Sequence, residues 1–65
     1  MSHQANDYAY VSVDNDNKVI GLASKEIDAK DMARRNKGTV VTLKKPVSCK
    51  TGDMMINRTF DKERY

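Results

Sequence analysis

The stretch YAYVSVDNDNKVIGLA, residues 8–23, decides the fold. Its first six residues alternate between two sets and are rich in aromatic and β-branched side chains, which is typical of a β-strand. The aliphatic set, Ala9, Val11 and Val13, is predicted to face the core. The letters DNDN follow at once. Because Asn and Asp tolerate left-handed backbone conformations, we expect residues 14–17 to form a hairpin turn.

The letters KVIGLA, residues 18–23, supply the return strand of this hairpin. Ile20 and Leu22 are predicted to face the core. Gly21 between them weakens the strand, and it indicates a bulge or a close approach by another part of the chain. The two segments together predict an antiparallel pair at the start of the domain.

A helix is predicted next, within SKEIDAKDMARRNKG, residues 24–38. Its starting point has two solutions, because either Ser24 or Asp28 can be the N-cap. In the second case Ile27 would pack onto Met32 as a hydrophobic staple. In both cases a narrow inward stripe follows the helical period. The stripe consists of Ala29, Met32, Ala33 and Asn36.

The helix is predicted to end before Gly38, which suits the left-handed position that follows a helix C-terminus. The letters TVVTLKK, residues 39–45, then predict a third strand of about five residues. Pro46 should end this strand, because proline cannot donate a hydrogen bond to a sheet ladder except at an edge. The helix is thus expected to connect the second strand to the third.

The remainder of the chain gives weaker signals. Residues 48–53 are typical of a turn, with Gly52 available for a positive φ angle. Residues 54–60 are predicted to form a short fourth strand or an irregular segment. This segment would place three side chains in the core: Met54, Ile56 and Phe60.

These elements predict a small α+β domain with the order β-β-α-β(-β). We expect a three- to four-stranded sheet with one helix packed on one face. Residues 7–60 are assigned to this single domain. Residues 1–6 are assigned to a disordered N-terminal arm and residues 61–65 to a loose C-terminal end.

Charge is distributed unevenly along the chain. The 65 residues carry 12 Lys and Arg against 9 Asp and Glu, which gives a formal net charge of +3. Residues 1–31 hold six acids and three bases, a net −3, whereas residues 32–65 hold nine bases and three acids, a net +6. Such asymmetry predicts a polarised surface and a charged partner.

No catalytic or metal-binding motif is apparent in the sequence. The one thiol, Cys49, and the one imidazole, His3, lie far apart, so neither a nucleophile with its base nor a zinc site is expected. The DNDN turn lacks the glycine and the distal glutamate of an EF-hand loop, and the sequence has no glycine-rich phosphate loop. We therefore predict a protein that is not an enzyme and uses no metal or cofactor.

No targeting or membrane-spanning segment is apparent either. The first eight letters, MSHQANDY, contain no apolar segment. No apolar run approaches the roughly 20 residues that span a bilayer. The sequence therefore predicts a cytoplasmic protein without a membrane partner.

The tyrosines of the first strand predict a protein-binding surface. Tyr8 and Tyr10 alternate with the aliphatic set and would lie on the outer face of the sheet. The acidic turn residues Asp14 and Asp16 would lie beside them. Our first hypothesis is a small protein-binding modulator or inhibitor that acts through this face and the charged ends of the domain. Its size alone also fits a bacteriophage accessory protein.

The stretch RRNKGTVVTLKKP, residues 34–46, supports an alternative hypothesis, a nucleic-acid-binding protein. Its cations would line one basic surface that neutralises phosphates. They are Arg34, Arg35, Lys37, Lys44 and Lys45. Two general effects weaken this interpretation, because cations favour any helix C-terminus and lysines at a strand end deter unwanted pairing.

A third hypothesis is a small structural subunit that associates with itself. Exposed edge strands can pair with a second copy of the same chain. This hypothesis predicts a homodimer joined through an edge strand.

Overall fold

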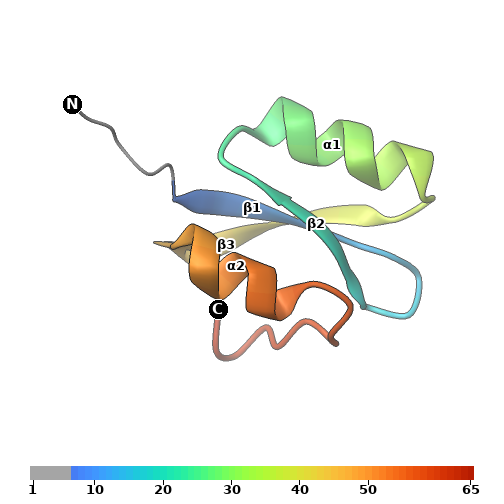
Figure 1. Ribbon diagram of the computed structural model, residues 1–65. Helices are drawn as coiled ribbons and strands as arrows, with labels where there is room; N and C mark the ends of the chain where they lie inside the picture. The colour runs from blue at the N-terminus through green and yellow to red at the C-terminus, as the bar shows by residue number, and fades with distance from the viewer. Residues whose placement is uncertain (1–6) are drawn as a thin grey trace.

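The computed structural model describes residues 7–65 as one three-stranded sheet between two helices (Figure 1). The elements in chain order are β1 (Tyr8–Val13), β2 (Val19–Ala23), α1 (Glu26–Arg35), β3 (Thr39–Val47) and α2 (Cys49–Met55). The strand order is β2-β1-β3, and both outer strands run antiparallel to β1. The predicted α+β class and the β-β-α-β order are confirmed. The arm predicted at residues 1–6 lies outside the described residues.

Strand β1 is the centre of the sheet because it pairs along both edges and is covered on both faces. Val11 and Val13 are 0% and 3% exposed, as their alternation predicted, and Ala9 is half-buried. Ser12 points to the opposite face, where its hydroxyl donates a 2.6 Å hydrogen bond to the carbonyl of Ala29 in α1. Helix α1 therefore covers one face of the sheet, and α2 with the C-terminal segment covers the other (Figure 1).

The hairpin turn predicted at residues 14–17 is confirmed. The Asp14 carboxylate oxygen Oδ1 accepts hydrogen bonds from the backbone N–H groups of Asp16 and Lys18, each at 2.9 Å. Asn17 has a φ of 62°, in the left-handed region that Asn tolerates. The side chains that predicted the turn are thus the ones that close it.

Helix α1 begins differently from both predicted solutions. Its N-cap is Lys25, which makes no side-chain capping hydrogen bond, so neither Ser24 nor Asp28 has that role. Ile27 is 73% exposed, so the predicted staple is not formed. The reason is tertiary, because the chain passes from β2 into α1 through two residues and the sheet fixes where the helix starts.

The inward stripe of α1 is confirmed except at its last position. Ala29 and Ala33 are buried, and the Met32 sulfur lies against Gly21, where a Cβ atom would overlap it. Gly21 therefore marks a close approach, as predicted. Asn36 is exposed instead of inward, and its Nδ2 donates a 2.9 Å hydrogen bond to the Met32 carbonyl.

The C-terminus of α1 shows why residue 38 is glycine. The left-handed residue is Lys37, with a φ of 56°, so the role predicted for Gly38 is wrong. The N–H of Gly38 donates to the Ala33 carbonyl at 2.8 Å, and that of Lys37 donates to the Arg34 carbonyl at 3.4 Å, which is a Schellman motif. A Cβ at Gly38 would overlap the carbonyl oxygen of Val13, so the glycine is required by the close contact with β1.

Strand β3 is longer than predicted and continues through Pro46 to Val47. Its register against β1 shifts between Tyr8, which pairs with Val47, and Tyr10, which pairs with Thr42. Pro46 thus lies where the ladder is interrupted, on an edge strand, so it needs no ladder donor. The expectation that this proline ends the strand is wrong for that reason.

Helix α2 replaces the turn predicted at residues 48–53. Ser48 is its N-cap, and the Ser48 Oγ accepts a 3.2 Å hydrogen bond from the N–H of Thr51. Gly52 does not have a positive φ angle. A Cβ there would meet the ring of Tyr8, so Gly52 lets that ring lie against the helix.

The segment after α2 forms no fourth strand, and the described sheet has three strands, within the predicted range. In place of the predicted fourth strand, this segment makes one isolated antiparallel bridge, between Lys18 and Thr59. Phe60 is buried as predicted, and Ile56 is half-buried. Met54, however, is 64% exposed, and Met55 is buried in its place. Neighbouring helical residues point about 100° apart, so only one of the two methionines can face the sheet.

The main core lies between the sheet and α2. Its buried members are Val11, Val13, Val19, Leu43, Met55 and Phe60, with Leu22 packed against them. Ile20 is half-buried. The C-terminal residues assigned to a loose end form a turn beside this core. The Tyr65 N–H donates to the Asp61 carbonyl at 3.1 Å, and the Tyr65 carbonyl accepts from the Lys44 N–H at 2.8 Å.

Candidate protein interface

The two tyrosines predicted to share an outer face lie on different sides of the sheet. Tyr10 is on the same side of β1 as Ser12, which is bonded to α1. Tyr8 lies beyond the register shift, against Gly52 of α2. Both tyrosines are half-buried. The structure therefore does not bring them together into one open aromatic surface.

Tyr8 is instead tied to the start of α2. A side-chain hydrogen bond with Cys49 raises the pKa of the Tyr8 phenol above its ordinary value. Coulombic repulsion from Cys49, burial, and repulsion from Asp53 act in the same direction. The Tyr8 hydroxyl thus belongs to the contact between β1 and α2.

The acidic turn lies at the other end of β1 from Tyr8. Its Asp14 carboxylate is occupied by two backbone N–H groups, which stabilise the turn. The Asp16 side chain is exposed. Neither acid adjoins Tyr8, so the four residues predicted to form one site are dispersed.

The cations of residues 34–45 also form two groups instead of one. The first group is at the end of α1 and the second lies along β3: Arg34, Arg35 and Lys37, then Lys44 and Lys45. At roughly 3.3 Å per strand residue, the start of β3 and its lysines are on the order of 15 Å apart. On α1, Arg35 pairs with Asp31 at 3.1 Å and Lys30 pairs with Glu26 at 3.7 Å.

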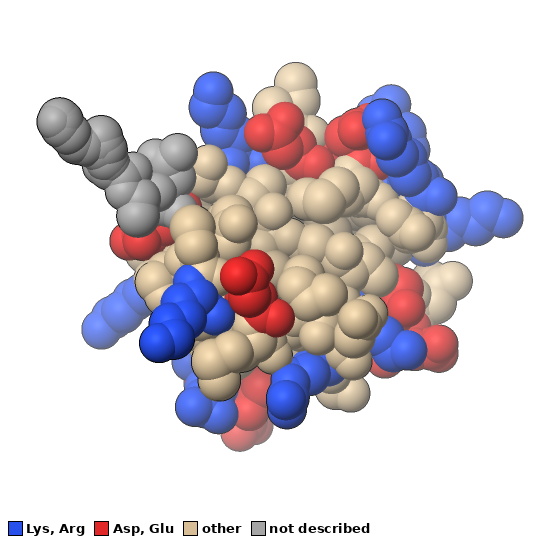
Figure 2. Space-filling model, viewed as in Figure 1, with Lys and Arg blue, Asp and Glu red and all other residues tan. Residues whose placement is uncertain are grey.

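A different set of cations gathers beside Tyr65, and we call it the C-terminal basic surface. It consists of Lys44, Lys45, Arg58 and Arg64. Within residues 7–65, none of these four is ion-paired with a carboxylate. Figure 2 shows blue and red groups next to each other both along α1 and on the α2 side of the molecule.

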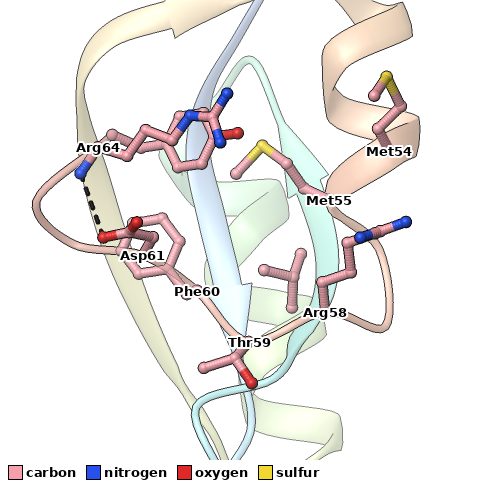
Figure 3. A pocket seen from close by; sticks show the side chains of 9 residues that line it. Met54, Met55, Arg58, Thr59, Phe60, Asp61 and Arg64 are labelled. Carbon is pink, nitrogen blue, oxygen red and sulfur yellow. Dashed lines mark hydrogen bonds between the residues drawn. The ribbon is translucent and has the colours of Figure 1, made fainter.

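Two hollows adjoin within the C-terminal basic surface, and Arg64 and Tyr65 line both. The larger has a volume of about 360 Å³ and the smaller about 280 Å³. In Figure 3 the larger hollow has Arg64 on one side and Arg58 on the other, with Met55 between them and Met54 on α2 at its border. The smaller hollow is lined by Lys44, Lys45, Pro46 and Val47 in addition.

The local fold fixes the backbone from which the two arginine side chains extend. Arg58 lies in the segment after α2, and its carbonyl accepts a 2.8 Å hydrogen bond from the N–H of Val19 in β2. Arg64 lies in the C-terminal turn, where its N–H donates to Asp61 Oδ1 at 3.3 Å (Figure 3). The Glu63 N–H donates to the same oxygen at 3.1 Å. The turn thereby holds Arg64 in place and offsets part of the Asp61 charge.

The ring of Tyr65 is engaged by its neighbours. It stacks with Phe60 at 6.2 Å between ring centroids, and the Arg64 guanidinium lies 5.6 Å from its centroid. Both distances are within the usual ranges for aromatic pairs and cation–π contacts. Arg64 therefore rests on an aromatic support that is itself anchored in the core.

Most of this surface was not predicted from the sequence. Lys44 and Lys45 were predicted to belong to a basic surface, but Arg58 and Arg64 were not assigned a role. Arg58 lies in a segment predicted as a short strand or an irregular segment, and Arg64 lies in the predicted loose end, so only the tertiary structure places them near the lysines. Nothing in the local sequence pattern connects the two arginines with the lysines.

Comparison with protein-family models, curated proteins and solved structures finds no match to this chain. Over residues 7–65, no group of three or more His, Cys, Asp or Glu side chains is placed to hold a metal ion. The helices of this part of the chain are too short or too polar to cross a membrane.

Proposed function

We propose that this chain is a non-enzymatic protein-binding module, a modulator or inhibitor, that engages an acidic protein through its C-terminal basic surface. The observation that carries the proposal is the set of four cations without carboxylate partners around two adjoining hollows. Arginine, tyrosine and methionine are the residue types enriched at protein interfaces, and the larger hollow is lined by all three. The net positive charge around it, two arginines against one aspartate, would orient a partner of the opposite sign.

The proposal keeps the predicted class of function and changes the surface. Tyr8 and Tyr10 support the fold on opposite sides of the sheet, so they contribute no shared binding face. Of the two predicted charged ends, the end of α1 has Arg35 paired with Asp31, whereas Arg34 and Lys37 have no carboxylate partner among residues 7–65. The cations beside Tyr65 differ in that they line two adjoining hollows.

A protein partner suits this surface better than a nucleic acid. Binders of single strands offer aromatic faces on which bases stack. The Tyr65 ring is already in contact with Phe60 and Arg64. The exposed Met54 side chain at the border of the larger hollow can contact an apolar side chain of a protein, whereas a phosphate backbone needs only a charged track.

The test is affinity capture with two variants of matched charge. The first reverses two cations of the C-terminal basic surface, Lys45→Glu with Arg64→Glu. The second reverses two at the end of α1, Arg34→Glu with Lys37→Glu. Each bait, immobilised, is incubated with nuclease-treated extract of the source organism, and the captured proteins are quantified by mass spectrometry.

We expect a specific protein to be captured by the wild type and by the α1 variant but not by the C-terminal variant. Calorimetry with that purified protein should then show an affinity that falls with salt. Capture that survives the C-terminal reversal would overturn the proposed surface. Recovery of nucleic acid alone from extract without nuclease would favour the alternative hypothesis.

A further inference from the structure

We infer that the partner segment recognised at this surface is an acidic peptide with one apolar anchor residue. The anchor would occupy the larger hollow, and carboxylates on either side of it would face the guanidinium groups. The inference rests on the proposed function and specifies the chemistry of its partner.

The border of the larger hollow offers an apolar contact at Met54. Its floor consists of Val19, Met55 and Phe60, which belong to the main core and are only 1%, 5% and 4% exposed, so they present little surface of their own. Met54 adds a flexible thioether at the border with 64% of its surface exposed. Such an exposed methionine can adapt to the shape of an inserted side chain. A volume of about 360 Å³ leaves room for one aliphatic or aromatic side chain with adjacent backbone.

The walls of the hollow favour carboxylates on both sides of the anchor. Arg58 and Arg64 stand on opposite sides of Met55 (Figure 3). Each guanidinium can bind a carboxylate through two parallel hydrogen bonds. Two anions separated by an apolar residue match this arrangement better than a single small anion.

The smaller hollow extends the basic character in one direction. Lys44 and Lys45 line it together with Arg64, so acidic residues on one side of the anchor would meet three cations. On the other side of the anchor, acidic residues would meet only Arg58 among the cations that line the larger hollow. The charges therefore predict a peptide that is more acidic on one side of its anchor than on the other.

One acidic side chain lines the larger hollow and would repel the carboxylates of an acidic peptide. Asp61 lines it, but its Oδ1 already accepts hydrogen bonds from the N–H groups of Glu63 and Arg64. Its negative charge is thus partly offset by local donors. The lining residues that carry formal charge are still positive in sum, two arginines against one aspartate.

The experiment is a titration of the full chain with synthetic peptides, followed by fluorescence anisotropy at low and at moderate salt. The main probe is a fluorescein-labelled peptide with a single Leu between runs of Glu. The second probe has Ser in place of Leu, and the third has Lys in place of Glu. A labelled single-stranded DNA of equal net charge is the fourth.

We expect the Glu–Leu–Glu peptide to bind and the lysine peptide not to bind. Loss of the anchor should weaken binding roughly tenfold or more, since burial of a Leu side chain is strongly favourable. Arg58→Gln and Arg64→Gln should each weaken binding roughly two- to fivefold at low salt. The matched variant Arg34→Gln, at the end of α1, should leave the affinity unchanged.

The methionines give a second readout within one sample. The methyl resonances of Met54 and Met55 should shift on addition of the main peptide, because both residues line the larger hollow. Met32 lies against Gly21 on the α1 side and should not shift. Shifts at all three methyl groups would indicate a general change of the fold and would overturn the assigned site.

The remaining outcomes separate this inference from the proposed function. Equal binding of the Leu and Ser peptides, or of the peptide and the DNA, would overturn the anchored acidic peptide. Failure of every peptide to bind, while a captured protein is still lost on reversal of Lys45 and Arg64, would remove the inference and leave the proposed function standing. Loss of both results would remove both.

Discussion

The two sides of the sheet are built on different principles. On the α1 side, small residues let the backbones approach, and Ser12, Ala29 and Ala33 form a thin, closely fitted layer. On the α2 side, larger apolar residues form the main core, and Phe60 and Met55 form the floor of a hollow.

The charges differ in the same way. On α1, Arg35 and Lys30 are paired with acids one helical turn away. On the other side, the C-terminal basic surface has no carboxylate partner among residues 7–65. Arg34 and Lys37 at the end of α1 also lack a carboxylate partner among residues 7–65, so the difference lies in the hollows: on the α2 side the unpaired cations border two adjoining hollows beside the main core.

The largest expected effect concerns the core under the C-terminal basic surface. Phe60→Ala should lower the free energy of unfolding by about 3–5 kcal/mol, because it removes a buried ring and leaves a cavity. The matched change on the α1 side, Ser12→Ala, should cost about 1 kcal/mol, since it removes one hydrogen bond of a small buried side chain. Urea unfolding followed by circular dichroism measures both. Equal losses would contradict the difference between the two sides.

A smaller effect is expected where the chain leaves α1 and passes against the end of β1. Gly38→Ala should lower the free energy of unfolding by about 3 kcal/mol, because the new Cβ would overlap the rigid carbonyl of Val13. Gly21→Ala is the control, and it should cost about 1 kcal/mol, because the Met32 side chain that it meets can move. Thermal unfolding of both variants ranks them. A more severe loss at Gly21 would show that Met32 is held more rigidly than the backbone contact.

The smallest effect should appear in the pH dependence of stability. Because the Tyr8 pKa is raised in the folded state, the folded chain holds this proton more tightly than the unfolded chain does. The resulting stability is fully present below the ordinary phenol pKa, about 10, and is lost as the pH rises through the folded pKa.

Tyr8→Phe should therefore reduce the loss of unfolding free energy between about pH 9 and about pH 11. Tyr10→Phe, on the α1 side, should keep the wild-type dependence. Urea titrations at the two pH values compare the three proteins. If the wild type and Tyr8→Phe lose the same unfolding free energy between the two pH values, the raised pKa of Tyr8 does not contribute to that loss.

The first half of the fold was largely predictable, because its signals are local. The Asp14 carboxylate and Asn17 conformation that close the hairpin are properties of those residues themselves. Alternation placed Val11 and Val13 in the core. The C-terminal half was predicted less well, since Gly52 favours a turn when viewed alone yet lies within α2 against the ring of Tyr8.

The sequence led to a hypothesis about the class of function, but it did not predict which residues lie together at the candidate site. Alternation along β1 put Tyr8 and Tyr10 on one face, but the register shift between them separates the two rings. A run of cations predicted one basic surface, but a nine-residue β3 divides that run. Local patterns carry no information on either event, because both depend on pairing with a distant strand.

The sequence by itself determined the hairpin, the amphipathic stripe of α1, the α+β order and the excess of positive charge after residue 31. These features arise from contacts between residues close in the chain, or from composition. Only the tertiary structure decided that Arg58 and Arg64 join Lys44 and Lys45, and that Met54 faces outward while Met55 faces the core. The physical reason is that the C-terminal segment takes its conformation from the apolar side of the sheet on which it packs.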